Sequence, residues 1–202
     1  MSIYGQQASA HLDLYQLSNE HRRKHAPTCE MYPSDPLQAP LWRVIAFLTR
    51  PQRILEVGCG YGYTAAVMAS STKPTCHVDT IEANLAHADL AEDAFRQRNF
   101  SRRIRVLRGR GQTILPKLRG HYDIVFLDGD WREYPGYLRE LRRLTRPGSM
   151  LVTANLSPLF GGWGMGLPGK HAIQSYITRL VRDARFRTYI IPGEWHAISV
   201  RV

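Results

Sequence analysis

Residues 54–64 read ILEVGCGYGYT, and this stretch decides the fold. The short apolar run at 54–57 predicts a buried parallel strand, and the alternating glycines Gly58, Gly60 and Gly62 predict a loop. A helix is expected to start at Thr64. Strand, glycine loop and helix in this order bring the backbone close to a ligand at the carboxyl end of a strand.

Two carboxylates near this loop narrow the choice of ligand. Glu56 lies inside the first strand, and Glu82 closes a second apolar run, where a carboxylate can accept the two hydroxyls of a ribose. Glu56 would repel a pyrophosphate but attract an ammonium or sulfonium group. Tyr63 stands where the dinucleotide motif G-x-G-x-x-G requires Gly or Ala. We therefore expect a nucleoside without phosphates and with positive charge, which is the chemistry of S-adenosylmethionine.

The length and composition predict one globular domain. The chain has 202 residues, of which 44% are hydrophobic, and we expect a single domain over 1–202 with a helical and loop extension at 1–35. Cys29, Cys59 and Cys76 form no CxxC pair, which indicates reduced thiols and a cytoplasmic setting. The start of the chain does not resemble a signal peptide, and no apolar run is long enough to span a membrane.

The net charge of +10 is the unusual bulk property. It raises the alternatives of an RNA partner or an anionic substrate such as a CoA thioester. The basic residues are scattered, however, at spacings typical of solvated helix faces. We expect an arginine-rich surface without a nucleic-acid role.

Strands and helices alternate along the chain. Strands are predicted at 54–57, 76–81, 104–107, 122–127, 149–153, 186–191 and 197–202. Helices are predicted from residue 2 to about 23 and at 41–48, 64–69, 84–98, 134–144 and 170–183. Asn84 is expected to cap the helix at 84–98. The buried stripe of that helix is predicted to comprise Leu85, Ala88, Leu90, Ala91, Ala94 and Phe95. His21 and His25 share a face of the first helix, and we expect both to be solvated.

Six short motifs occur in the order and spacing of a known family. They are LEVG at 55–58, GYT at 62–64, IE at 81–82, GQT at 111–113, YDIVFLD at 122–128 and RPG at 146–148. From residue 36 onwards the chain resembles the S-adenosylmethionine-dependent O-methyltransferases of the catechol and caffeoyl-CoA type. The resemblance implies an α/β, Rossmann-like class I methyltransferase fold. Its sheet is mostly parallel and seven-stranded, with an antiparallel last strand and helices on both faces. It also implies a small hydroxylated, aromatic acceptor and leaves a homodimer open.

The resemblance also assigns site residues by position. The residues implied to bind the cofactor are Glu56, Gly58, Gly60, Gly62, Tyr63, Thr64, Glu82, Ala83, Gly111, Gln112 and Asp128. Within this set, Glu82 would bind the ribose, Gly111 and Gln112 would line the adenine, and Asp128 would lie beside the sulfonium. Asp128 would also be a metal ligand.

The chain departs from this family at two positions. The Asp-Asn pair that helps to hold a divalent cation reads Ala154-Asn155 here, and the lysine beside the first aspartate is replaced by Trp131. We therefore expect Asp128 and Asn155 to form a weak magnesium site or none. A side-chain base is then required, and Asp130 is the first candidate.

Further candidates surround the expected acceptor position. His171 and His196 are the outside candidates for the base. Trp163 and Met165, together with Tyr32 and Trp131, are expected to form a wall over an aromatic acceptor.

Three other functions stay open at this stage. A tRNA-modifying methyltransferase would use the arginines as a contiguous phosphate track. A catalytically silent S-adenosylmethionine-binding protein would account for Ala154 and Trp131. A NAD-dependent dehydrogenase is disfavoured by Glu56 and the glycine spacing.

Overall fold

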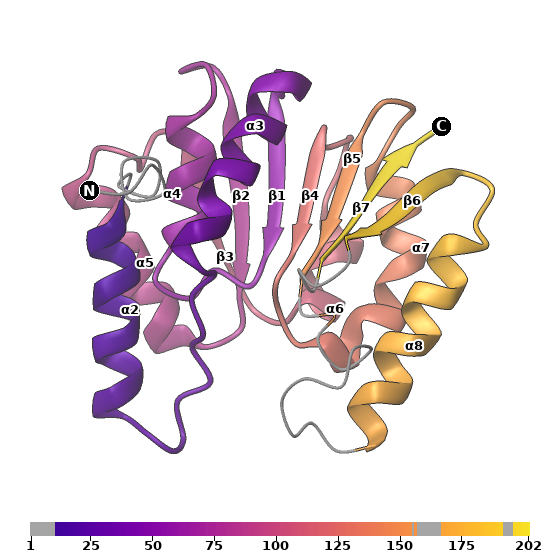
Figure 1. Cartoon of the computed structure of the whole chain (residues 1–202). Helices are drawn as coiled ribbons and strands as arrows, with labels where there is room; N and C mark the ends of the chain where they lie inside the picture. The colour runs from indigo at the N-terminus through magenta and orange to yellow at the C-terminus, as the bar shows by residue number, and fades with distance from the viewer. Residues whose placement is uncertain (1–10, 155, 157–166, 192–195) are drawn as a thin grey trace.

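A seven-stranded sheet forms the centre of the computed structural model, which describes residues 11–154, 156, 167–191 and 196–202 (Figure 1). The strands are β1 (Arg53–Val57), β2 (His77–Glu82), β3 (Ile104–Arg108), β4 (Ile124–Leu127), β5 (Met150–Thr153), β6 (Phe186–Ile191) and β7 (His196–Arg201). Their order is β3-β2-β1-β4-β5-β7-β6, and β7 pairs antiparallel with both β5 and β6. The expected fold class is therefore confirmed.

Helices cover both faces of this sheet. The α-helices are α2 (Leu12–Lys24), α3 (Ala39–Thr49), α4 (Tyr63–Ser70), α5 (Leu85–Gln97), α6 (Gly111–Ile114), α7 (Tyr134–Leu144) and α8 (Leu167–Val181). The 3-10 helices are η1 (Pro36–Gln38), η2 (Leu115–Lys117) and η3 (Trp131–Glu133). None of the helices among the described residues combines the length and apolar character needed to cross a bilayer.

The central strands β1 and β4 are mostly apolar because both of their faces are covered. In β1, Ile54 packs with α3 and α4, whereas its neighbour Leu55 packs with α7 and α8. In β4, Ile124 and Val125 divide between the two faces in the same way. This alternation separates the core into two layers, one on each side of the sheet.

The N-terminal helix α2 packs against the same side of the domain as α4 and α5 (Figure 1). Leu14 is fully buried, and the ring of Tyr15 lies 5.9 Å from that of Tyr63 between centroids. Asp13 forms an ion pair with Arg98, which follows α5. The helix begins at Leu12, and the expectation of helix before residue 11 lies outside the described residues.

The predicted buried stripe of α5 is wrong at Leu85, which is 60% exposed. Asn84 caps this helix as expected, since its side chain accepts hydrogen bonds from the backbone N–H groups of Ala86 and His87. In the first turn of the helix His87 and Ala88 are buried, whereas Leu85 faces solvent.

Several predicted boundaries also shift, among them those of β4 and α8. Strand β4 starts at Ile124 rather than at Tyr122, because the Tyr122 N–H donates to the carbonyl of Leu144 and not to the sheet. Helix α8 starts at Leu167, three residues before the predicted start, whereas α7 has the predicted bounds.

Candidate active site at the carboxyl edge of the sheet

The glycine loop follows the carboxyl end of β1, and no room is left for a side chain at Gly58 or Gly62. Gly58 has φ +100°, and a Cβ there would lie 2.4 Å from the carbonyl oxygen of Asp128. Gly62 has φ +87°, and a Cβ there would lie 2.3 Å from the ring of Phe95. Both glycines are therefore required by the packing of the loop between β4 and α5, whatever ligand binds above it.

Glu82 ties this loop to the end of β2. One carboxylate oxygen accepts from the N–H of Gly60 and the other from the N–H of Asn84, each at 2.8 Å. Burial raises the pKa of Glu82, and the backbone N–H donors of Asn84 and Gly60 act in the opposite direction. The backbone N–H groups of Cys59 and Ala83 also lower this pKa, so the carboxylate faces donors from both the glycine loop and the turn after β2.

Glu56 carries an unpartnered oxygen in the interior. Its side chain is 1% exposed, and Oε2 accepts from the hydroxyl of Thr80 at 2.5 Å. Oε1 is buried and has no hydrogen-bond partner among the described residues. Burial raises the pKa of Glu56 to about 8, with the negative charges of Asp128 and Glu82 adding to that effect against the Thr80 hydrogen bond. A cationic ligand beside this carboxyl would favour its ionised form and lower its pKa.

Asp128 completes a group of three carboxyl side chains. It follows β4 directly, and its N–H donates to the carbonyl of Val57 at 2.8 Å. Its Oδ2 accepts from the hydroxyl of Ser34 at 2.6 Å, and that hydroxyl accepts from Thr64 at 3.1 Å. Ser34 therefore joins the loop before η1 to the site. Sequence patterns did not indicate Ser34, because 94 residues separate it from Asp128.

The predicted adenine-binding positions lie along the same edge. The strands β2 and β3 pair up to Glu82 and Arg108, and the N–H of Gly109 donates to the carbonyl of Glu82. Ala83 is exposed just after β2, while Gly111 opens α6 and is buried. Gln112 is exposed in the first turn of α6.

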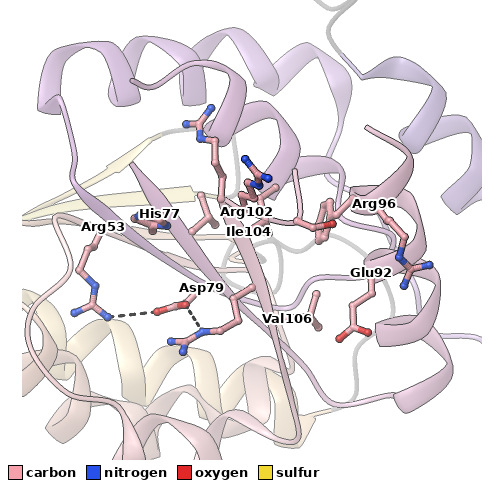
Figure 2. Close-up of a pocket in the computed structure, with 13 residues that line it drawn as sticks. Arg53, His77, Asp79, Glu92, Arg96, Arg102, Ile104 and Val106 are labelled. Carbon is pink, nitrogen blue, oxygen red and sulfur yellow. Dashed lines mark hydrogen bonds and ion pairs between the residues drawn. The ribbon is translucent and has the colours of Figure 1, made fainter. Parts of the chain in front are cut away.

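A large hollow lies at the opposite edge of the sheet, with a volume of about 700 Å³ (Figure 2). Arg53 and His77 on its rim form the first residue pair of β1 and β2, at their amino ends. Figure 2 shows Arg53 pointing towards Asp79, which also pairs with Arg105 at 2.8 Å. Arg53 and Arg105 already have Asp79 as their carboxylate partner. We therefore place the candidate site at the carboxyl edge and not in this hollow.

Comparisons with known proteins identify the family of this chain. Residues 6–189 match the model of a family described as O-methyltransferase. This chain belongs to the O-methyltransferase family. It is 32% identical over 126 residues to O-methyltransferase hkm8 of Aspergillus hancockii, covering 60% of this chain and 50% of that protein. It is 29% identical over 125 residues to a catechol O-methyltransferase of Niastella koreensis, covering 60% of this chain and 57% of that protein. The chain thus spans about half the length of these two relatives.

Solved structures share the fold of this O-methyltransferase. The O-methyltransferase TomG of Streptomyces achromogenes, solved in complex with SAM, superposes with a TM-score of 0.80 at 20% identity and full coverage of both chains. The O-methyltransferase of Bacillus cereus, solved in complex with SAH, gives a TM-score of 0.80 at 19% identity. That match covers 95% of this chain and 90% of the other.

The described residues of this O-methyltransferase do not fit the divalent-cation site that its family resemblance implies. Ala154 lies beside Asp128 at the end of β5, is 3% exposed and offers no oxygen from its side chain. Oδ2 of Asp128 is already bonded to Ser34, and no group of three His, Cys, Asp or Glu ligands gathers around Asp128 in the described part of the chain. Asn155, the second expected ligand, lies outside the described residues.

The candidate bases of the O-methyltransferase lie in different settings. Oδ1 of Asp130 accepts from both the N–H and the Nε of Arg132, at 3.0 and 2.8 Å. Burial acts to raise the pKa of Asp130, but these hydrogen bonds outweigh it and lower the pKa. This geometry suits a cap of η3 better than a base, so the role of Asp130 stays a prediction without support from its contacts.

The two histidine candidates also differ. His171 is exposed on α8. His196 is 4% exposed and lies at the start of β7, next to the pair of Thr153 and Ala197, which places it at the carboxyl edge. Its ring lies 5.0 Å from that of Trp42 between centroids. Of the proposed acceptor wall, Trp131 is partly buried against α7 and Tyr32 is 70% exposed, while Trp163 and Met165 lie outside the described residues.

Proposed function

We propose that this O-methyltransferase transfers the methyl group of S-adenosylmethionine to an oxygen of a small hydroxylated, aromatic acceptor, without a magnesium ion. The observation that carries the proposal is the group of three carboxyl side chains at one edge of the sheet, Glu56, Glu82 and Asp128, around a glycine loop. The unpartnered Oε1 of buried Glu56 fits a ligand that brings positive charge.

Each carboxyl group has a separate part in binding. Glu82 accepts the ribose hydroxyls, and the N–H groups of Gly60 and Asn84 hold its carboxylate in place. Glu56 and Asp128 hold the cationic methionine end, and the Ser34 hydroxyl keeps Asp128 in place. Ala83, Gly111 and Gln112 line the adenine.

Charge in the site contributes to binding more than to the chemical step. S-Adenosylmethionine supplies a methyl group on a positively charged sulfur; the S–C bond breaks as the O–C bond forms. Because the positive charge on sulfur disappears along the way, Glu56 and Asp128 attract the reactant more strongly than the transition state. The rate must therefore come from placing the acceptor oxygen in line with the methyl group, and from a base that takes its proton.

The distribution of charge favours a small acceptor over RNA. Arginines along the chain are engaged in ion pairs with carboxylates, as Arg108 is with Glu92 and Arg142 is with Asp183, both at 2.6 Å. A phosphate track needs cations that are free to release counterions. Paired arginines spread over several elements support a solvated surface instead.

An acceptor screen tests the proposal. The protein is incubated with S-adenosylmethionine and a panel of catechols, other phenols, aliphatic alcohols and tRNA, in magnesium-free buffer and with added magnesium. We expect S-adenosylhomocysteine to form with at least one phenolic acceptor at a similar rate in both buffers. Formation with tRNA alone, or no formation with any acceptor, would contradict the proposal.

A further inference from the structure

Three potential metal ligands from separate parts of the chain meet beside the glycine loop. His21 comes from α2, Cys29 from the segment that follows it, and His87 from the first turn of α5. One ligand atom from each of these side chains lies within 4.8 Å of the other two. The sequence expectation that His21 is only solvated is therefore incomplete, because it did not include two partners from distant positions.

The spacing of these atoms suits a tetrahedral metal site. Sγ of Cys29 and Nε2 of His87 are 3.7 Å apart. Two ligands at the usual zinc–sulfur and zinc–nitrogen distances are separated by about 3.6 Å in a tetrahedral site. The ring of His21 lies 5.4 Å from that of His87 between centroids, and its ligand atom lies within 4.8 Å of those of Cys29 and His87.

The setting keeps both imidazoles in the form that binds metal. Burial lowers the pKa of His21, and the neighbouring His25 and His87 lower it further. Burial also lowers the pKa of His87, with His25 adding to that effect. Neutral imidazole has a free lone pair for a metal ion.

The set of ligands also selects the class of metal. It contains two imidazoles, one thiol and no carboxylate, which favours a zinc-class transition metal over magnesium or calcium. His25 is not the fourth ligand through its Nδ1, since that atom lies 2.9 Å from the carbonyl oxygen of His21. A water molecule can take the fourth position.

The position of the cluster connects it to the candidate active site. The segment after Cys29 contains Met31, whose Cγ would lie 3.3 Å from a Cβ at Gly60. It also contains Ser34, which donates to Asp128. A metal ion at the cluster would hold this segment against α5 and so fix one wall of the site.

We propose that His21, Cys29 and His87 bind one zinc-class transition-metal ion, with water as the fourth ligand, which clamps the segment at 25–34 onto α5. On binding, the thiol of Cys29 loses its proton to solvent and coordinates as the thiolate. The site is separate from the magnesium position discussed for Asp128, and the proposal does not depend on the proposed function.

A cobalt titration of the full chain tests this site. The metal-free protein is titrated with Co²⁺, which reports a thiolate ligand through its charge-transfer absorption and tetrahedral geometry through its visible bands. We expect one equivalent to bind and to be displaced by Zn²⁺ but not by Mg²⁺. Affinity should fall on the order of 100-fold or more in Cys29→Ser and His87→Gln. The exposed His121 provides the control variant His121→Gln, which should bind as the native chain does.

Two results would overturn the proposal. One is cobalt binding without the thiolate band, or with equal affinity in Cys29→Ser and His87→Gln. The other is no saturable binding up to about 100 µM metal, far weaker than zinc sites of this kind. In either case the contact between Cys29 and His87 is an ordinary hydrogen bond.

Hydrogen exchange on the native chain tests the metal site even if the Cys29→Ser and His87→Gln variants do not fold. In the native chain, Zn²⁺ should slow backbone exchange at residues 28–34 while leaving β6 unchanged. Equal exchange in this segment with and without Zn²⁺ would count against the clamp.

Discussion

Replacing Glu82 by Gln removes one negative charge from the candidate site and changes few atoms. The native carboxylate accepts from the N–H groups of Gly60 and Asn84, each at 2.8 Å. In Glu82→Gln the amide oxygen can accept from one of them, but the amide NH₂ faces the other. The substitution therefore acts on both the bound ribose and the glycine loop.

The size of the effect follows from these contacts. Hydrogen bonds to a charged group contribute about 1.5–3 kcal/mol each. Loss of charge from two ribose contacts, partly compensated by the remaining amide oxygen, should weaken S-adenosylmethionine binding by about 1–3 kcal/mol. That corresponds to roughly a 5- to 150-fold increase in Kd. In the variant, the N–H of either Gly60 or Asn84 faces the amide NH₂ and loses its acceptor. This loss should also lower the stability of the fold by about 1–3 kcal/mol.

Calorimetric titration with S-adenosylmethionine measures the first effect, and thermal unfolding without ligand measures the second. Glu92→Gln is the matched control, because Glu92 lies on α5 at the surface and pairs with Arg108 outside the site. Affinity should fall in Glu82→Gln and stay within about twofold in Glu92→Gln. An unchanged affinity in a folded Glu82→Gln protein would refute the assignment of Glu82 to the ribose.

Three further predictions concern Glu56, the metal position and the segment before η1. The pKa of Glu56 is raised by burial to about 8, above its unfolded value, so the stability that it contributes should be fully present at low pH and lost as pH rises from about 5 to 8. Thermal unfolding across this range should show a smaller decline in Glu56→Gln than in the native chain, and equal declines would count against the assignment. Ala154→Asp restores a carboxylate beside Asp128 and should tighten Mg²⁺ binding at least ~10-fold by calorimetry; no gain would mean that the surroundings block the site. Because Ser34 and Met31 contact the site, hydrogen exchange at residues 28–38 should slow when S-adenosylmethionine binds, and exchange that does not change would exclude this segment from the ligand wall.

The mostly parallel character of the sheet and most of its elements could be predicted from local patterns. The apolar runs ending in Val57 and Leu127 predict strands buried on both faces, and turn residues separate them from helices. The carboxyl ends of parallel strands meet at one edge, so the sequence also predicts that Glu56, Glu82 and Asp128 lie together. In the structure the N–H of Asp128 donates to the carbonyl of Val57, the residue after Glu56, and Glu82 accepts from the N–H of Gly60.

Contacts between distant segments could not be predicted in this way. Ser34 lies in a proline-rich loop, and no periodic pattern relates it to Asp128. Cys29 and His87 are 58 residues apart and meet only because α2 and α5 pack on the same side. Leu85 is exposed although it is apolar and at the start of α5, because burial there depends on which elements pack over the first turn.

The role of Asp130 as a base could not be judged from the sequence either. Its place one residue beyond the glycine that follows Asp128 makes it a natural candidate for a base. The structure shows it bonded to Arg132 at the start of η3, with a lowered pKa. The sequence identifies the carboxyl group, but the direction of its pKa shift depends on neighbours that only the structure shows.

A crystal structure of the chain with S-adenosylhomocysteine tests the central claim most directly. We expect the nucleoside at the glycine loop, with both ribose hydroxyls within about 3.2 Å of the Glu82 carboxylate. The amino group of the ligand should face Glu56 or Asp128, and the arginine-lined hollow of Figure 2 should hold no ligand. A nucleoside bound in that hollow, or elsewhere away from Glu82, would contradict the account.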